Sequence, residues 1–281
     1  MLKTGFESAR GKYHGFRRAL VRLKVRSFQP KVQINECVGA YQIKTAETEA
    51  ELLEVLRLRA EVFFEEKSFG NGKTFGLDFD KYDLLGDHLI LKDLKSGQCI
   101  GTYRVLSNLF SEEFYSESEF EMEEFSKSPD TKLELGRACI AKEFRNGVSL
   151  NLIWKGIGAY AQSIGAKYIF GCTSISSLNR MIAESMTVHF FNEAIVTNEF
   201  VIKPRKKNQF KMKDYHPISV DMDVTKLIPA LMNSYIKAGA KVIANPALDR
   251  KFGCFDFLTI LDISKMDEKY KRRYFPGAIH A

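Results

Sequence analysis

Four short stretches of the 281-residue chain concentrate charged side chains that could act on a small charged molecule. Besides Glu61, they supply three carboxylates, which can bind ammonium groups or accept protons, and three guanidiniums, which bind carboxylates through paired hydrogen bonds. The alternative is an ion-pair scaffold inside the fold, because buried charges are stable only when they are paired. The four stretches are Arg59-Ala-Glu-Val-Phe63, Asp80-Lys-Tyr-Asp83, Gly101-Thr-Tyr-Arg104 and Glu134-Leu-Gly-Arg137.

Glu134 and Arg137 fall in an apolar run, residues 133–141, which we predict to be a central strand. Successive residues of a regular strand point to opposite faces, so an odd separation would place the two charges on different sides of the sheet. A bulge at Gly136 would bring them to the same side, and glycines inside strands often mark bulges near active sites. Asp80 and Asp83 lie on a loop that leads into another strand, from which they could reach the same end of the sheet.

Hydrophobic periodicity predicts the elements that would position these residues. A helix over 46–67 carries Arg59, and a loop rich in glycine and aspartate over 68–87 carries the two aspartates. A second helix over 150–164 has apolar residues at helical spacing and ends at Gly165. The other predicted elements are strands over 88–92, 99–106, 168–172, 241–244 and 256–263, a helix over 227–238, and an irregular surface excursion over 107–132. This order predicts one α/β (α+β) domain over residues 41–281.

A basic extension, residues 1–40, precedes this domain. Its first 33 residues carry nine lysines and arginines against Glu7 alone, whereas the whole chain has a net charge of +7, so the remainder is close to neutral. Because the charge belongs to an appendage, we expect no nucleic-acid partner. Apolar residues at helical spacing predict an amphipathic helix that could lie on an anionic bilayer; a helix docked on its own domain and a disordered tail are the alternatives. The apolar positions are Phe6, Ala9, Tyr13, Phe16, Leu20 and Leu23.

Several other kinds of site find no support in the sequence. The five cysteines include no Cys-x-x-Cys pair and the histidines show no metal-ligand spacing, so we expect no bound metal. The glycine motifs of nucleotide-binding proteins and the Gly-x-Ser-x-Gly elbow of serine hydrolases are missing. No apolar run is long enough to span a bilayer, and the N-terminus lacks the apolar core of a secretory signal. We therefore expect a cytoplasmic protein.

The charged residues, taken in order, resemble the core pattern of the acyl-homoserine-lactone synthases, which belong to the GCN5-related N-acyltransferase (GNAT) superfamily. Over residues 45–270 the chain is more similar to a related branch, the bacterial ornithine–acyl-carrier-protein N-acyltransferases, often labelled hemolysin-like. The first resemblance involves Arg59, Phe63, Phe69, Asp80, Asp83, Arg104, Glu134 and Arg137, although Phe69 stands where the lactone synthases usually carry tryptophan. The second adds Asp87-His-Leu-Ile, Tyr115-Ser-Glu-Ser-Glu-Phe120, Leu152-Ile-Trp-Lys-Gly-Ile157, Gly171-Cys-Thr-Ser174 and Asp249-Arg-Lys-Phe252.

The resemblance implies a GNAT-like fold, which is a mixed, mostly antiparallel, twisted sheet flanked by helices, with splayed central strands. It implies an enzyme that moves a long-chain fatty acyl group, with or without a 3-hydroxyl, from acyl carrier protein to the α-amine of ornithine or a similar amino acid. That reaction would be the first step of aminolipid synthesis. The product would be a lipid, so we expect a location on the inner face of the cytoplasmic membrane.

The resemblance also implies roles for the charged residues. A glutamate would accept the proton of the attacking amine, directly or through a water, once desolvation had raised its pKa. The aspartates would hold the ammonium groups of the substrate, and the arginines would bind its carboxylate or keep the acids in place. The expected catalytic residues are Glu134 and Arg137, and the expected substrate-binding residues are Arg59, Asp80, Asp83 and Arg104.

The acyl donor is expected at the turn Arg145-Asn-Gly147-Val-Ser149, where the intact pyrophosphate loop of acetyl-CoA enzymes is missing. The first amides of the following helix favour an anion, and glycine allows close approach. A reduced cradle suits the single phosphodiester of the acyl-4′-phosphopantetheine arm of acyl carrier protein; acyl-CoA is the alternative donor, and no bound cofactor is expected. Backbone amides near Cys139 and Ile140 would meet the oxyanion, and Ser174 would contact the arm or the leaving thiol.

A second basic cluster lies within eleven residues of the C-terminal half. It could dock an acidic carrier protein, contact an anionic membrane, or be a solvated loop. Its members are Lys203, Arg205, Lys206, Lys207, Lys211 and Lys213. Two rival functions stay open: an acyl-homoserine-lactone or other long-chain N-acyl amino acid synthase, and a non-catalytic membrane-binding or lytic protein.

Overall fold

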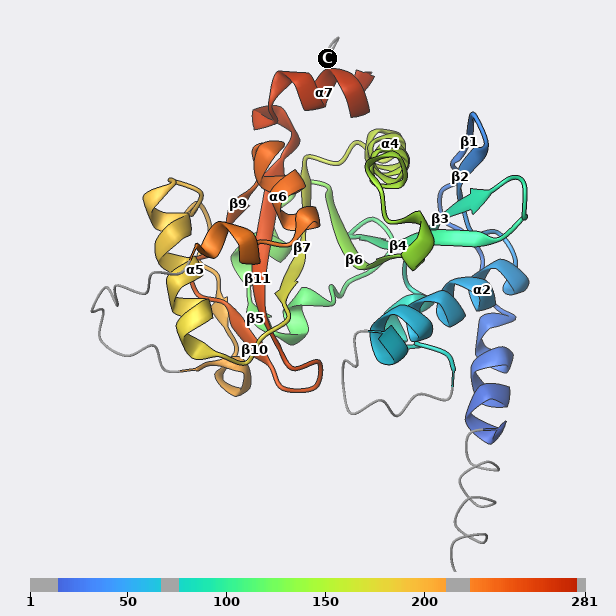
Figure 1. Ribbon diagram of the computed structural model, residues 1–281, viewed down its shortest axis with the longest axis horizontal. Helices are drawn as coiled ribbons and strands as arrows, with labels where there is room; N and C mark the ends of the chain where they lie inside the picture. The colour runs from blue at the N-terminus through green and yellow to red at the C-terminus, as the bar shows by residue number, and fades with distance from the viewer. Residues whose placement is uncertain (1–14, 67–75, 211–222, 277–281) are drawn as a thin grey trace, which may run out of the picture. The chain divides into compact units, whose positions relative to one another are not determined.

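The computed structural model describes residues 15–66, 76–210 and 223–276 (Figure 1). Residues 1–14 of the basic extension lie outside the described residues, as do Phe69, Lys211 and Lys213. The chain divides into two compact units, each of which is treated by itself. The first unit comprises Met1–Val105 and Arg137–Tyr160, and the second comprises Leu106–Gly136 and Ala161–Ala281.

An antiparallel meander of four strands forms the sheet of the first unit (Figure 1). The C-terminal half of β6 lies beside β4, where Ala141 N donates a hydrogen bond to Ile100 O at 2.8 Å. The strands predicted over 88–92 and 99–106 are confirmed, whereas β1 and β2 are too short to show a clear alternation. The strands are β1 (Asn35–Val38), β2 (Tyr41–Thr45), β3 (Asp87–Asp93), β4 (Cys99–Ser107) and β6 (Lys132–Ile140).

Both helices predicted for this part of the chain are confirmed, with shifted ends. The first is α2 (Glu49–Ala60), capped by the Thr48 hydroxyl, and it continues as one π-helical turn, η1 (Glu61–Glu66). Such turns are rare and often occur at functional sites. The second is α4 (Gly147–Ser163), where the Asn146 side chain accepts a hydrogen bond from Ser149 N at 3.0 Å. None of the helices in the described residues is both long and apolar enough to cross a bilayer.

A further helix over residues 15–25 packs on the first unit. Val21 and Val25 are buried in the same hydrophobic cluster as Leu52 and Leu56 of α2. Beyond this helix, the Asp87 carboxylate accepts hydrogen bonds from the backbone amides of residues 31 and 32 at 2.9–3.0 Å. The described part of the basic extension is therefore docked on its own unit, which was one of the alternatives open from sequence.

The second unit is organised around β7 and β11, which pair antiparallel over eight residues. The N-terminal half of β6 pairs with β7 in parallel over three residues, from Lys132 to Glu134, and β6 then continues into the first unit. This pairing makes the sheet mixed and mostly antiparallel, as predicted. The strands are β7 (Tyr168–Ile175), β9 (Lys241–Val242), β10 (Ala247–Asp249) and β11 (Cys254–Asp262), with a separate pair β5 (Phe120–Glu121) and β8 (Lys203–Pro204).

The segment over 107–132 is irregular, as predicted, but the prediction that it lies on the surface is wrong for its aromatic residues. Phe114, Phe120 and Phe125 are buried. The rings of Phe114 and Phe125 pack edge-to-face on Phe170, with 4.9 and 5.0 Å between the ring centroids. The many acidic residues between these aromatic positions concealed their burial. This unit also contains the helices α3 (Glu123–Ser126), α5 (Arg180–Asn192), α6 (Ala230–Lys237) and α7 (Glu268–Tyr274), of which α6 lies within the predicted helix over 227–238.

Gly171 of β7 allows the close approach of β6. A Cβ atom on Gly171 would lie 2.2 Å from the carbonyl oxygen of Leu135, a backbone atom that moves only if the strand moves. We therefore expect Gly171→Ala to lower the free energy of unfolding by about 1–3 kcal/mol, measured by urea denaturation. Gly147→Ala is the matched control, because nothing lies within 4 Å of its Cβ position. Equal midpoints for the two variants would contradict this account.

Candidate functional site

Six charged side chains of the first unit form a closed ring of ion pairs, which we call the charge ring. Each guanidinium lies between two carboxylates, and the N–O distances around the ring run from 2.6 to 3.2 Å. Because three positive and three negative charges alternate, the charge ring has no net charge. Its members, in order, are Arg59, Asp78, Arg137, Asp80, Arg104 and Asp83, which pairs again with Arg59.

The charge ring is sealed on one side and open on the other. The side chains of Arg59 and Asp83 are 0% exposed, whereas those of Arg137 and Asp80 are 11% and 21% exposed. Burial by itself would raise the pKa of Asp83, but the Arg59 and Arg104 guanidiniums outweigh it and hold that pKa well below its usual range. The sealed side therefore matches the ion-pair scaffold, and Asp80 and Arg137 are the members most able to meet another molecule.

Local sequence positions the two aspartates predicted from the Asp-x-x-Asp stretch. Asp80 caps a short 3-10 turn, η3 (Lys81–Asp83), by accepting a hydrogen bond from Tyr82 N at 2.8 Å. Asp83 reciprocates by accepting one from Asp80 N at 2.7 Å. This capping box holds both carboxylates in place through local hydrogen bonds, in addition to their contacts with the arginines. The Tyr82 ring packs on the Arg104 guanidinium, with 5.4 Å between the guanidinium carbon and the ring centroid.

Arg137 has a left-handed backbone, with φ of 53°, inside strand β6. This conformation costs a non-glycine residue about 1 kcal/mol or more and breaks the alternation of the strand. The irregularity predicted at Gly136 therefore occurs one residue later. It aims the Arg137 side chain at Asp78 and Asp80, with N–O distances of 3.2 and 2.9 Å.

His88 lies beneath the charge ring and is fully buried. Its Nε2 lies 3.0 Å from the carbonyl oxygen of Asp83. Burial lowers the pKa of His88 to about 4, against the opposing charge of Asp83. The imidazole is therefore neutral at pH 7, and Nε2 donates to the carbonyl, which can only accept. This arrangement is that of a structural histidine rather than an acid–base group.

Glu134, the predicted general base, lies in the second unit and is 4% exposed. Its Oε2 accepts a hydrogen bond from Tyr115 N at 2.7 Å, and its Oε1 accepts from Ser116 N at 2.6 Å and Ser116 Oγ at 2.5 Å. A carboxylate has about four lone-pair positions, so little acceptor capacity is left. Its role as a base stays a prediction, and it would need a lone pair beyond these three contacts.

A buried group of acids lies next to Glu134 within the second unit. Ser116 Oγ lies 3.4 Å from Cys172 Sγ, which in turn lies 3.8 Å from Glu119 Oε2. Glu119 shares a hydrogen bond with Asp256, whose Oδ1 also accepts one from Ser174 Oγ at 2.5 Å. Asp249 on the neighbouring strand completes what we call the acid cluster, namely Glu119, Asp249 and Asp256.

The acid cluster lacks a compensating cation in the described part of the chain. No ion pair joins Glu119, Asp249 or Asp256 to a lysine, arginine or histidine among these residues. Burial and the charge of Asp256 raise the pKa of Glu119 to about 9, and burial also raises the pKa of Asp256. Isolated charges are costly to bury, so protons occupy part of the acid cluster at neutral pH and a cation could replace them.

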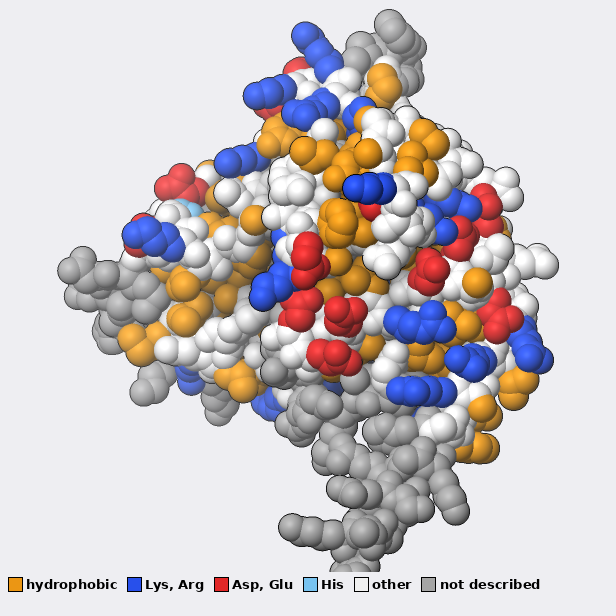
Figure 2. All heavy atoms as spheres, turned by 45° about the vertical axis from the view of Figure 1, so that its right-hand side comes forward, with side chains coloured by type: hydrophobic (Ala, Val, Ile, Leu, Met, Phe, Trp, Pro, Cys, Tyr) orange, Lys and Arg blue, Asp and Glu red, His pale blue; other side chains and the backbone are white. Residues whose placement is uncertain are grey.

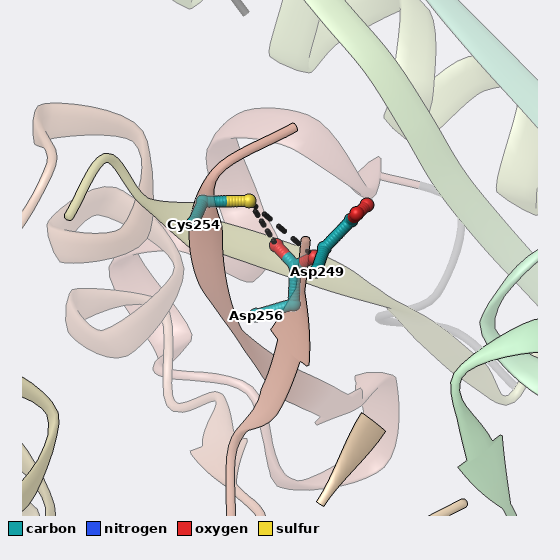
Figure 3. Close-up of side chains that lie close together, drawn as sticks. All are labelled: Asp249, Cys254 and Asp256. Carbon is teal, nitrogen blue, oxygen red and sulfur yellow. Dashed lines mark hydrogen bonds between the residues drawn. The ribbon is translucent and has the colours of Figure 1, made fainter. Parts of the chain in front are cut away.

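Three side chains here could also be considered as metal ligands. Asp249, Cys254 and Asp256 each place one ligand atom within 4.8 Å of the others (Figure 3). The Cys254 thiol lies 3.7 and 3.8 Å from the two Asp256 oxygens, while Asp249 Oδ1 already accepts hydrogen bonds from the amides of residues 251 and 252. Burial raises the pKa of Cys254, which disfavours the thiolate that binds metals. This chemistry suits an organic cation better than a metal ion.

The predicted donor residues of the first unit surround the start of α4. The Arg145 guanidinium donates to Ile140 O at 2.9 Å and to Glu66 at 2.7 Å, so its charge is already paired. The space around Gly147 is open. The Ser149 hydroxyl is fully buried and has no hydrogen-bond partner among the described residues. These features leave room at the N-terminal end of the helix for a group that accepts hydrogen bonds.

The other residues that were predicted to bind the acyl donor lie elsewhere. Cys139 is buried in a hydrophobic cluster with Leu58, Val62 and Phe63 at the end of α2. Ser174 belongs to the second unit, where its hydroxyl is engaged by Asp256. A contact between Ser174 and the donor arm therefore stays a prediction, and its observed partner is an acid.

Four acidic residues of these constellations were not identified as site residues from sequence. Asp78 precedes Asp80 by two positions in the same loop, and only the fold shows that it bridges Arg59 and Arg137. The acid cluster comes from three separate segments. A signal existed, since Glu119 and Asp249 fall within two of the stretches that resemble the ornithine acyltransferases, but those stretches carried no assigned role.

Residues 58–155 match the family of acetyltransferase (GNAT) domains. The chain is 29% identical over 254 residues to an L-ornithine N(alpha)-acyltransferase of Rhizobium meliloti, with 84% of this chain and 85% of the relative covered. It is 26% identical over 253 residues to an enzyme of the same name from Brucella abortus, with 84% and 89% covered. Among solved structures, the acyl-homoserine-lactone synthase LasI is similar, with 16% identity, a TM-score of 0.46, and 84% of this chain and 94% of LasI covered.

Proposed function

We propose that this chain, an acyltransferase with a GNAT domain, transfers a long-chain fatty acyl group to the α-amine of ornithine or a similar diamino acid. The product would be an N-acyl amino acid, which is the first intermediate in the synthesis of an aminolipid. Two curated relatives that match most of the chain are named L-ornithine N(alpha)-acyltransferase, which supports this acceptor. Acyl carrier protein is the proposed donor.

The observation that carries this proposal is the acid cluster. Ornithine has two ammonium groups at pH 7, and a buried group of acids that forms no ion pair with a cation among the described residues is suited to bind them. In the free protein, protons on the carboxyl groups take the place of a cation, because burial and the neighbouring charge of Asp256 raise the pKa of Glu119 to about 9. An ammonium group that enters would displace such a proton and gain charge-assisted hydrogen bonds.

The proposed reaction needs no enzyme nucleophile. The amine nitrogen attacks the thioester carbonyl, the C–N bond forms, the C–S bond breaks, and the pantetheine thiol leaves. The α-ammonium must first lose a proton, and Glu134 is the proposed acceptor, directly or through a water. Glu134 connects to the acid cluster through Ser116 and Cys172, so one unit supplies both the base and the cation-binding acids.

The charge ring has a different proposed role. Its six members neutralise one another. The aspartates are already paired with arginines, so they attract substrate ammonium groups only weakly. We assign contact with reactants to the exposed pair, Asp80 and Arg137, where Arg137 could bind a carboxylate. Arg59, Asp83 and Arg104 act as positioning residues for that pair.

The second basic cluster, which lies in the second unit, supports a carrier-protein donor. Lys203, Arg205, Lys206 and Lys207 are its described members, and all four are exposed. The β10–β11 turn adds Arg250, whose guanidinium donates to Lys207 O at 2.7 Å. Carrier proteins are acidic, and complementary charge speeds docking. Acyl-CoA is the alternative donor that the assay below tests.

The decisive experiment supplies purified protein with long-chain acyl carrier protein and detects products by mass spectrometry. We expect N-acyl-ornithine. The matched acceptor is norvaline, which has the same carbon chain without the terminal ammonium, and we expect kcat/KM for norvaline to be at least about 30-fold lower, because a buried charge contact is lost.

The other outcomes would each count against a stated part of the proposal. Equal rates with norvaline would remove the role of the acid cluster. Turnover with S-adenosylmethionine and none with ornithine would indicate a lactone synthase. Equal rates with acyl-CoA would remove the carrier-protein requirement, and a protein that transfers no acyl group to any amine would favour a non-catalytic membrane-binding function.

A further inference from the structure

The helix over residues 15–25 has two apolar sides, and only one of them is covered. Val21 and Val25, four residues apart, are 6% and 0% exposed and pack into the core of the first unit. Phe16, Leu20 and Leu23 lie on the other side of the helix by their spacing and are 63%, 42% and 57% exposed. We call these three residues the apolar stripe.

Basic residues flank the apolar stripe along the same helix. Arg17, Arg22 and Lys24 are exposed in the structure, as is Arg26 just beyond the helix. Figure 2 shows basic and hydrophobic side chains intermixed at the lower right of the molecular surface. A monomer in water gains nothing from exposing a large aromatic ring and two leucines among cations.

The helix is held firmly by its other side. Beyond the two buried valines, Lys24 Nζ lies 5.8 Å from the centroid of the Phe79 ring. The residues that follow are tied to β3 through the Asp87 carboxylate. The apolar stripe is therefore presented on a fixed element of the first unit rather than on a free tail.

From this arrangement we infer that the helix over residues 15–25 binds an anionic lipid surface, with the apolar stripe inserted at the boundary between headgroups and acyl chains. The occupant follows from charge and shape: cations on both sides of a three-residue apolar stripe match anionic headgroups above a hydrocarbon layer. Because Val21 and Val25 keep the opposite side docked, the first unit would lie on the membrane in one orientation. This inference stands independently of the proposed acyl transfer.

The test measures co-sedimentation of the full chain with two kinds of vesicle. One is pure phosphatidylcholine, and the other contains about one quarter phosphatidylglycerol. We expect binding to the anionic vesicles, at least tenfold weaker binding to neutral ones, and a decrease with added salt. The stripe variant combines Phe16→Ser, Leu20→Ser and Leu23→Ser and should lose at least tenfold in partition coefficient.

Control variants separate this role from general hydrophobicity and from folding. Val201→Ser removes an apolar side chain that is 75% exposed on the second unit, and it should bind vesicles like the unmodified chain. The stripe variant should keep its thermal midpoint, because its three side chains are exposed. Unchanged binding by the stripe variant, or equal binding to both vesicle types, would overturn the inference. So would a shift from dimer to monomer caused by the stripe variant, since a second copy would then be the occupant.

Discussion

Replacing Arg59 with methionine is expected to lower the free energy of unfolding by about 3–5 kcal/mol, the usual result of removing one partner from a buried ion-pair network. Arg59 is fully buried and contacts Asp78 at 2.6 Å and Asp83 at 2.7 Å. Methionine fills similar space but leaves both carboxylates without their guanidinium. The measurement is the urea midpoint at pH 7, followed by circular dichroism, with unchanged slope.

Arg57→Met is the matched control, because Arg57 lies on the same helix with an exposed side chain, and its substitution should change stability by less than about 0.5 kcal/mol. The pH dependence gives a second check. The folded-state pKa of Asp83 is depressed, so its contribution is complete above the ordinary aspartate pKa and is lost as pH falls through the folded value. The difference between Arg59→Met and the unmodified chain should therefore shrink in acid. A constant difference would mean that packing, rather than charge, is what Arg59 supplies.

Replacing Asp256 with asparagine is expected to lower kcat/KM for ornithine by about 100-fold while leaving norvaline nearly unchanged. Asp256 is the buried partner of Glu119 and Ser174 in the acid cluster. Asparagine keeps the size and the hydrogen bond from Ser174 but removes the charge that would bind an ammonium group. The selectivity ratio between the two acceptors is the informative quantity, because a general folding defect would lower both rates together.

The acid cluster also predicts a pH dependence with a definite sign. Because Glu119 holds a proton up to about pH 9 in the free protein, binding of an ammonium group must release protons. The KM for ornithine should therefore fall as pH rises from 6 to 9, and the KM for norvaline should not.

For an acid with a raised pKa, folding stability is greatest below the ordinary glutamate pKa and is lost as pH rises through 9. Glu119→Gln should flatten that loss, and an unchanged stability profile would contradict the raised pKa.

Much of the fold could be predicted from local sequence patterns. The helix that carries Arg59, the β3–β4 hairpin and the strand–helix–strand crossover through α4 all occur where periodicity places them. These elements are long and have regular apolar spacing, which is what periodicity detects. The segment over 107–132 differs because its three buried aromatic residues are separated by acids and match neither helical nor strand spacing.

The candidate site was harder to predict because its contacts join distant segments. The sequence shows that Arg59, Asp83 and Arg137 are charged, but not that they close a ring with Asp78. Burial is equally invisible: nothing local to Glu119 indicates that it faces Asp256 from the other half of the chain. The irregular backbone at Arg137 lies one residue from the position that the sequence predicts, since a glycine within a strand is a visible signal.

The closure of the charge ring limits how these six positions can change during evolution. Each member faces two opposite charges, so replacing a single member by an uncharged residue leaves two neighbours short of a partner and gives the neutral arrangement a net charge of one unit. Viable descendants must therefore exchange positions in matched pairs, or lose several at once in favour of apolar packing. Among distant relatives, these arginines and aspartates should be inherited as a block.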